Sequence, residues 1–181
     1  ELVLVLGGTR SGKSEFAEKY VLHQGAIGAY LATAEILDDE MAVRVKLHKE
    51  RRKQRWVNYE APYAAEEVLP EAGQAADAIL FDSLTVYLSN LIYGKEPLQG
   101  TTEAKAAAVR ERIAKVLAAA RATGKTVVFV ASDVGGGIVP ANPMDREFQD
   151  LAGWVNPQVG AASHRVYSVL LGQLADRTHT T

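Results

Sequence analysis

The sequence predicts a three-layer α/β fold in which a mostly parallel sheet is flanked by helices, and three observations support this. Short apolar runs alternate with helical stretches along the chain. A glycine-rich loop follows the first apolar run and opens a helical segment. The chain has 181 residues, of which 48% are hydrophobic, which suits one domain with a full core. We therefore expect residues 1–181 to form a single α/β domain.

Five buried strands are expected, because five runs are short, apolar and separated by helical or turn-forming stretches. They are Leu2–Leu6, Ala26–Ala32, Ala78–Phe81, Thr126–Ala131 and Arg165–Leu171. A core helix is expected before the fourth strand, where apolar residues recur at helical spacing from Val109 to Ala120. Gly124 follows as its stop signal.

The loop after the first strand matches the phosphate-loop pattern at all eight positions. Its glycines allow backbone N–H groups to point at phosphate oxygens, and the following helix, expected from about Lys13 to Tyr20, adds positive potential. Lys13 is expected to reach the β and γ phosphates, and Ser14 to offer a hydroxyl to Mg²⁺. A chance glycine-rich turn is the alternative, but the strand–turn–helix setting favours a nucleotide-binding, P-loop NTPase-like (RecA-like) fold. The eight residues are Gly7, Gly8, Thr9, Arg10, Ser11, Gly12, Lys13 and Ser14.

Two further loops follow expected strands and are candidates for the same site. A phosphate loop needs a carboxylate at the end of a neighbouring strand to hold Mg²⁺, often through water, and Asp82 supplies one. Capping of the helix that begins near Ser83 is the alternative role for Asp82, and both roles can hold at once. Loop 131–140 contains three consecutive glycines, so a substrate cleft and a flexible connection are both open interpretations.

The composition argues against several classes of partner. The chain has 20 Lys and Arg and 22 Asp and Glu, which gives a net charge of −2, so no long-range positive field attracts nucleic acid. The chain has no cysteines, which excludes disulfides and thiolate metal sites and fits a reducing compartment. It shows no secretory leader and no apolar run near ~18 residues. We expect a cytoplasmic protein with no membrane span.

Residues 36–55 form the segment with the densest charge, and it contains His48. Arg44, His48 and Arg52 are spaced four residues apart, so on a helix they share one face suited to phosphates. A neutral imidazole is a competent nucleophile toward phosphorus, and neighbouring cations stabilise the charge that develops there. A solvated charged helix with an ordinary histidine is the alternative. The other histidines, His23, His164 and His179, are expected in ordinary or solvated positions, the last in an unstructured tail.

Several ordered motifs together resemble one enzyme family over nearly the whole chain. The resemblance is to the bifunctional adenosylcobinamide kinase / adenosylcobinamide-phosphate guanylyltransferases of cobalamin biosynthesis. It implies phosphoryl transfer from ATP or GTP to adenosylcobinamide, then transfer of GMP from GTP to its phosphate, with Mg²⁺ as cofactor and a homo-oligomer reported as a trimer. The motifs are residues 7–14, 30–34, 39–41, 44–49, 82–85, 88–91, 134–140, 146–148 and 153–156.

The resemblance also implies roles for individual residues. His48 takes the place of the family's guanylylated histidine, and loop 7–14 that of its nucleotide cradle. The positions that align with GTP-contacting segments are Thr33, Ala34, Glu35, Lys49, Glu50, Arg51, Arg52, Glu60 and Asp82. The departures from the family pattern are Lys53 in place of a proline, Ser132-Asp133 in place of Asn-Glu, and Pro157 in place of a frequent glutamine.

Other functions remain open on the sequence alone. A simple small-molecule kinase of the same fold would use His48 only as a passive phosphate contact. A regulatory nucleotide-binding module would switch a partner protein and turn over slowly. Nucleic-acid binding is a third alternative, but the basic segment lacks interleaved aromatic residues.

Overall fold

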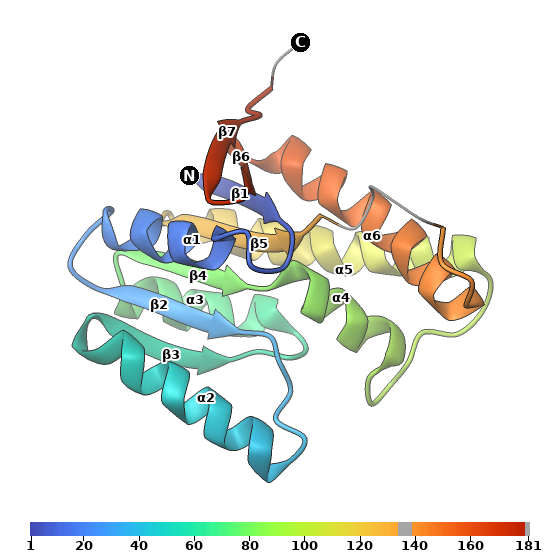
Figure 1. Cartoon of the computed structure of the whole chain (residues 1–181), viewed down its shortest axis with the longest axis horizontal. Helices are drawn as coiled ribbons and strands as arrows, with labels where there is room; N and C mark the ends of the chain where they lie inside the picture. The colour runs from blue at the N-terminus through green and yellow to red at the C-terminus, as the bar shows by residue number, and fades with distance from the viewer. Residues whose placement is uncertain (134–138, 180–181) are drawn as a thin grey trace.

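The computed structural model describes residues 1–133 and 139–179. In these residues seven strands form one sheet in the order β3-β2-β4-β5-β1-β6-β7 (Figure 1). Every neighbouring pair is parallel except β6 and β7, which pair antiparallel. The strands are β1 Leu2–Gly7, β2 Gly28–Ala32, β3 Trp56–Glu60, β4 Ala78–Asp82, β5 Thr126–Ser132, β6 Arg165–Leu170 and β7 Gln173–Asp176.

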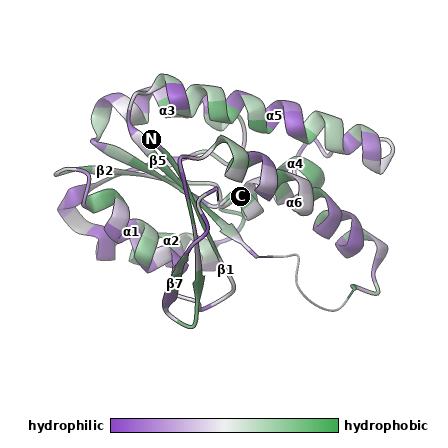
Figure 2. Ribbon diagram, turned by 90° about the horizontal axis from the view of Figure 1, so that it is seen from above, coloured by the Kyte–Doolittle hydropathy of each residue, from purple (hydrophilic) through white to green (hydrophobic). Residues whose placement is uncertain are grey.

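Helices cover both faces of the sheet (Figures 1 and 2). Helix α1 packs on one face, against β1, β4 and β5, whereas α3, α5 and α6 pack side by side on the other face. Helix α2 follows β2 and lies beside β3 at the sheet edge (Figure 1). The helices are α1 Lys13–Leu22, α2 Asp39–Arg52, α3 Ala65–Ala75, α4 Leu84–Tyr93, α5 Thr102–Ala122 and α6 Pro143–Ala162, with a short 3-10 helix at Lys53–Arg55.

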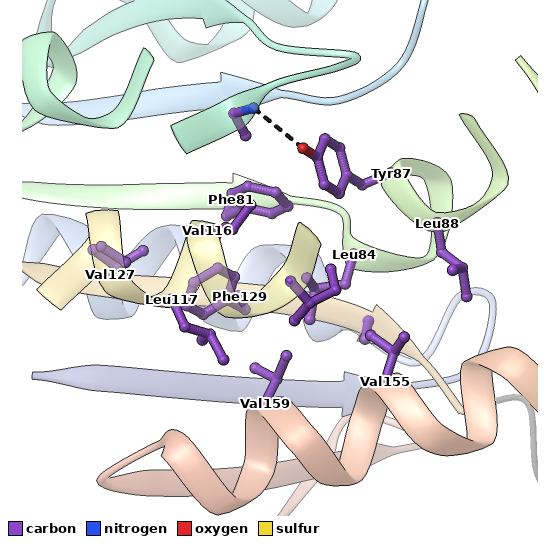
Figure 3. Close-up of a cluster of buried hydrophobic side chains, with 14 of the residues drawn as sticks. Phe81, Leu84, Tyr87, Leu88, Val116, Leu117, Val127, Phe129, Val155 and Val159 are labelled. Atoms are coloured by element: carbon purple, nitrogen blue, oxygen red, sulfur yellow. Dashed lines mark hydrogen bonds between the residues drawn. The ribbon is translucent and has the colours of Figure 1, made fainter. Parts of the chain in front are cut away.

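The central strands β1, β2, β4 and β5 are buried on both faces, as their continuous apolar runs predict. On β1, Leu2 and Leu4 belong to the core under α3, α5 and α6, and Val3 and Val5 to the core under α1. Successive side chains of a strand point to opposite faces, so the one run supplies both cores. Figure 3 shows the larger core, where the Phe81 and Phe129 rings lie 5.1 Å apart.

Most of the expected elements are confirmed. All five predicted strands exist, although β2 begins at Gly28, because the backbone before it is held by side chains instead: Ile27 N–H donates to Asp77 and Ala26 C=O accepts from Arg55. The core helix is α5, and Gly124 follows it with φ +68°, a conformation that favours glycine. Strands β3 and β7 were not predicted.

The charged segment is helical from Asp39 to Arg52, and none of its residues is buried. No helix in the described ranges has the length and apolar character needed to cross a bilayer.

Candidate active site

Parallel strands bring the candidate residues to one edge of the sheet. The carboxyl ends of β1 to β5 carry the phosphate loop, Thr33, Glu60, Asp82 and Ser132. The strand register places Ala32 between Glu60 and Asp82, and Gly7 opposite Ser132. Ligands of open α/β sheets bind outside these carboxyl ends. The fold therefore gathers most of the predicted nucleotide-binding residues on the side where such a ligand binds.

The phosphate loop is shaped by its own backbone. Ser11 N–H donates to Gly8 C=O at 3.3 Å, and Gly12 begins α1 at φ +95°. Among the described residues no side chain caps this helix, so none of their side-chain oxygens competes with an anion for its first N–H groups. Lys13 Nζ donates to Gly8 C=O at 3.1 Å, which holds its ammonium group over the loop. The loop therefore has backbone donors and one ammonium group that suit a phosphate.

Close packing beneath the loop explains why Gly7 is a glycine. A Cβ added there would lie 2.4 Å from Ser11 Oγ and 2.9 Å from Val169 O. The Ser11 hydroxyl is itself buried and has no hydrogen-bond partner among the described residues. Any larger residue at position 7 would displace the loop from β6.

Asp82 lies two strands from the phosphate loop and is held by a half-buried tyrosine. Tyr30 Oη on β2 donates to Asp82 Oδ2. Burial, together with the neighbouring Asp82 charge, raises the pKa of the Tyr30 phenol, so it stays protonated and remains a donor. The alternative capping role of Asp82 is wrong, because the Ser83 side chain accepts from Val86 N–H and caps α4. The Asp82 carboxylate therefore does not cap α4.

Arg52 connects the end of α2 to this tyrosine. Its guanidinium carbon lies 3.5 Å from the centroid of the Tyr30 ring, and it donates to Asn58 Oδ1 at 3.0 and 3.3 Å. Burial raises the pKa of the nearby Glu18 carboxyl, and the Arg52 charge opposes that shift. A cation, two carboxyl groups and a phenol therefore meet where β2 and α1 face α2.

Thr33 and Glu35 have structural partners. Thr33 is fully buried, and its hydroxyl both accepts from Ser83 N–H and donates to Ser83 C=O at 2.8 Å. Glu35 accepts from Tyr63 Oη at 3.0 Å and pairs with Lys95 at 3.2 Å. The Thr33 hydroxyl therefore serves the Asp82–Ser83 segment, while the Glu35 carboxylate ties the end of β2 to neighbouring loops.

The structure does not bring His48 to the phosphate loop. His48 is exposed on α2, beside the strand β3, whereas the loop follows β1, four strand spacings or about 19 Å away. Arg44 pairs with Glu40 at 2.9 Å, and Lys49 pairs with Glu60 at 3.5 Å. Glu50 and Arg51 are exposed on the same helix, and Ala34 is half-buried after β2.

Some contributing residues were missed by sequence reasoning. Tyr30 and Asn58 hold Asp82 and Arg52, and Asn90 donates to the carbonyls of Thr33 and Pro62. A tyrosine inside a buried strand was a usable signal, since a buried phenol needs a polar partner. The glycines at 135–137 lie outside the described residues, but Asp133 N–H donates to Gly7 C=O at 3.2 Å and links that loop to the phosphate loop.

The expectation of an unstructured tail is also corrected, whereas His164 lies exposed in the bend before β6, an ordinary position as expected. His164 Nδ1 accepts from Leu2 N–H at 2.9 Å, and His179 Nε2 lies 2.6 Å from Ser163 O. Thr178 bonds to both backbone groups of Val166. Thr178 thus fastens the chain end to β6, and His179 fastens it to the end of α6, so the described part of the tail is structured.

Comparison with known proteins identifies the family. The family model for cobinamide kinase / cobinamide phosphate guanyltransferase matches residues 3–176. The chain belongs to this family. Among curated members of the cobinamide kinase / cobinamide phosphate guanyltransferase family, it is 35% identical to the bifunctional adenosylcobalamin biosynthesis protein CobU of Escherichia coli strain K12, over 94% of this chain and 96% of that protein.

Two other curated relatives give the same result. CobU of Salmonella typhimurium is 36% identical, over 94% of this chain and 96% of its own length. CobP of Pseudomonas aeruginosa, also described as a bifunctional adenosylcobalamin biosynthesis protein, is 32% identical, over 93% and 92%. The resemblance, the fold class and the enzyme class are therefore confirmed, and the regulatory module is disfavoured.

Proposed function

We propose that this enzyme phosphorylates adenosylcobinamide with ATP or GTP, and then transfers GMP from GTP to the product through a covalent intermediate on His48. The final product is adenosylcobinamide-GDP. The phosphate loop supports this most strongly, because it stands at the carboxyl edge of the sheet with Asp82 on the same edge. Membership of a kinase and guanyltransferase family supports both halves.

In the kinase half, the hydroxyl of the aminopropanol arm attacks the γ-phosphorus. The bond to the leaving nucleoside diphosphate breaks and the hydroxyl loses its proton. The uncapped N–H groups of α1 orient the phosphates, and Lys13 exchanges Gly8 C=O for a phosphate oxygen.

The oxygen donors near the loop fit Mg²⁺. Ser14 offers a hydroxyl and Asp82 a carboxylate, and Mg²⁺ prefers such hard oxygen ligands. The described residues contain no group of three or more His, Cys, Asp or Glu able to hold a metal. That suits a cation bound by one or two protein oxygens, water and substrate phosphates. When bound, it neutralises charge on the transferring phosphoryl group.

In the transferase half, an imidazole nitrogen of His48 attacks the α-phosphorus of GTP and pyrophosphate leaves. A phosphate oxygen of adenosylcobinamide phosphate then attacks the same phosphorus, the P–N bond breaks and the imidazole is restored. His48 is exposed, and Lys49 and Arg52 place cations on the same helix. Those cations stabilise the charge that develops on phosphorus.

Helix α2 must approach the nucleotide for this step. It buries no residue, and its described polar links to the sheet are Lys49 with Glu60 and Arg52 with Asn58 and Tyr30. Leaving its place would therefore expose little core. We infer that GTP takes over these cations and that α2 shifts between half-reactions, within one chain or toward the site of another copy in a homotrimer. Structures with and without GTP test this, and an unchanged α2 would contradict it.

The decisive experiment traps the intermediate. The protein is incubated with Mg²⁺ and GTP labelled at the α-phosphate, denatured and mapped by mass spectrometry. We expect an acid-labile, base-stable GMP adduct that is lost in His48→Ala and kept in His23→Ala, since His23 is also exposed. Tight GTP binding without an adduct would refute the transferase half and favour a simple kinase.

A further inference from the structure

The turn between β6 and β7 carries an unusual residue. Leu171 and Gly172 form a two-residue hairpin loop, and both have positive φ, 50° and 75°. Such turns favour Asn, Asp or Gly at the first position, because a branched side chain is strained there. Leucine at this position therefore opposes the local backbone preference.

Packing does not explain the leucine. Leu171 is 86% exposed, and its neighbour Leu170 is 72% exposed. Neither buries enough surface to offset strain in the turn. A strained residue that folding does not require is a reason to look for a ligand.

The turn lies against the phosphate loop. Gly172 N–H donates to Ser11 C=O at 2.8 Å, and a Cβ added to Gly12 would lie 3.7 Å from Gly172 Cα. Strand β6 runs parallel to β1, with Val169 opposite Gly7, so the turn projects from the same carboxyl edge as the loop. Figure 2 shows the β6–β7 hairpin beside the end of β1.

The arrangement across the sheet gives the nucleotide a direction. Asp82 ends β4, on one side of β1, and the hairpin lies on the other side. If the β and γ phosphates face the Asp82 carboxylate and its cation, the nucleoside end must leave the loop toward β6 and β7. That end carries a flat purine whose faces are apolar.

We propose that Leu170 and Leu171 form an apolar platform for the nucleobase of the nucleotide bound by the phosphate loop. The inference rests on the proposed kinase function of that loop. It assigns a base-binding surface to the phosphoryl donor, separate from the α2 segment that is proposed to contact GTP in the transferase half.

Two substitutions at the turn separate strain from binding. Leu171→Asn removes the apolar surface and suits positive φ, whereas Leu171→Met keeps an apolar side chain and the strain. Calorimetric titration with ATP and with inorganic tripolyphosphate, both with Mg²⁺, compares a ligand that has a base with one that does not. We expect Leu171→Asn to weaken ATP about tenfold, to leave tripolyphosphate within about twofold, and not to lower the thermal midpoint. Leu171→Met should stay within about twofold for both ligands.

The outcomes are distinguishable. If Leu171→Asn leaves the ratio of ATP to tripolyphosphate affinity unchanged, the platform is overturned, but the proposed function of the phosphate loop is not. If the ratio is unchanged and Leu171→Asn also dissociates an oligomer in sedimentation, the turn belongs to an interface between copies, and the platform is again overturned. A wild-type protein that binds neither ligand refutes the phosphate-loop function, and this inference with it.

Discussion

Replacing Thr33 with valine tests the link that holds the Asp82 segment in place. Thr33 is fully buried after β2, and its hydroxyl makes two hydrogen bonds of 2.8 Å to the backbone of Ser83. Valine has nearly the same shape but no hydroxyl, so the change removes both bonds without leaving a large cavity. The backbone bond from Thr33 N–H to Asp82 C=O, at 3.0 Å, is kept.

The two lost bonds are not equal in cost. Ser83 C=O keeps a second partner, Tyr87 N–H at 3.1 Å, so losing the hydroxyl there costs about 1 kcal/mol or less. Ser83 N–H has the Thr33 hydroxyl as its acceptor, and an unsatisfied, partly buried donor costs at least about 1 kcal/mol. Together we expect Thr33→Val to lower the free energy of unfolding by about 2 kcal/mol. In a chain of this length that lowers the melting temperature by about 4–8 °C.

Urea unfolding of wild type, Thr33→Val and Thr33→Ser at one protein concentration measures the effect. Serine keeps the hydroxyl and loses a buried methyl group, so we expect it to lie between the other two, about 1 kcal/mol below wild type. The dependence of unfolding free energy on urea should stay constant across the series. The reasoning is refuted if Thr33→Val matches wild type or is more stable than Thr33→Ser.

Two other predictions concern the loop and the helix layer. Gly7→Ala should weaken ATP binding at least about tenfold, measured by calorimetry, because the backbone leaves no space for a Cβ there. A Cβ at Gly8 would meet nothing within 4 Å, so the free energy of unfolding of Gly8→Ala, measured in urea, should lie within about 0.5 kcal/mol of wild type. Lys105 Nζ lies 2.7 Å from Glu147 Oε1 and lowers the pKa of the Glu147 carboxyl. The pair therefore stabilises the fold fully above the pKa that Glu147 has in the unfolded chain. This stabilisation is lost as the pH falls through the lower pKa of the folded protein. Glu147→Gln should therefore cost about 1 kcal/mol at pH 7, and equal unfolding free energies there, or a gap that persists in acid, would contradict this.

The sequence was most informative where the determining contacts are local. The phosphate loop, α1 and β1 follow from consecutive residues, and the five predicted strands are apolar runs. Strand β3 was missed because only Trp56 of its five residues is buried, so it offers no apolar run. Strand β7 has no buried residue at all. It is specified by pairing with β6 rather than by its own composition.

Contacts between strands could not be predicted, because they depend on the sheet order. Tyr30 reaches Asp82 only because β4 lies next to β2, and 52 positions separate them in the chain. The sequence also suggested Asp82 as the cap of the helix that follows, whereas Ser83, another residue type that caps helices, takes this role. The backbone decides it: Ser83 has extended dihedrals, φ −136° and ψ 161°, and directs its own hydroxyl to Val86 N–H.

The sheet order also explains why the two proposed half-reactions need different parts of the molecule. From β1 the chain leaves through α1 on one face, and from the neighbouring β5 it leaves through α6 on the other. Where the connections after two neighbouring strands run to opposite faces of the sheet, a crevice forms outside the carboxyl ends of those strands. The phosphate loop and Asp133 stand at this point, which is where we propose the kinase site. His48 lies at the far edge, on a helix with no buried residue, so the guanylyl step that we propose requires α2 to move to the phosphate loop.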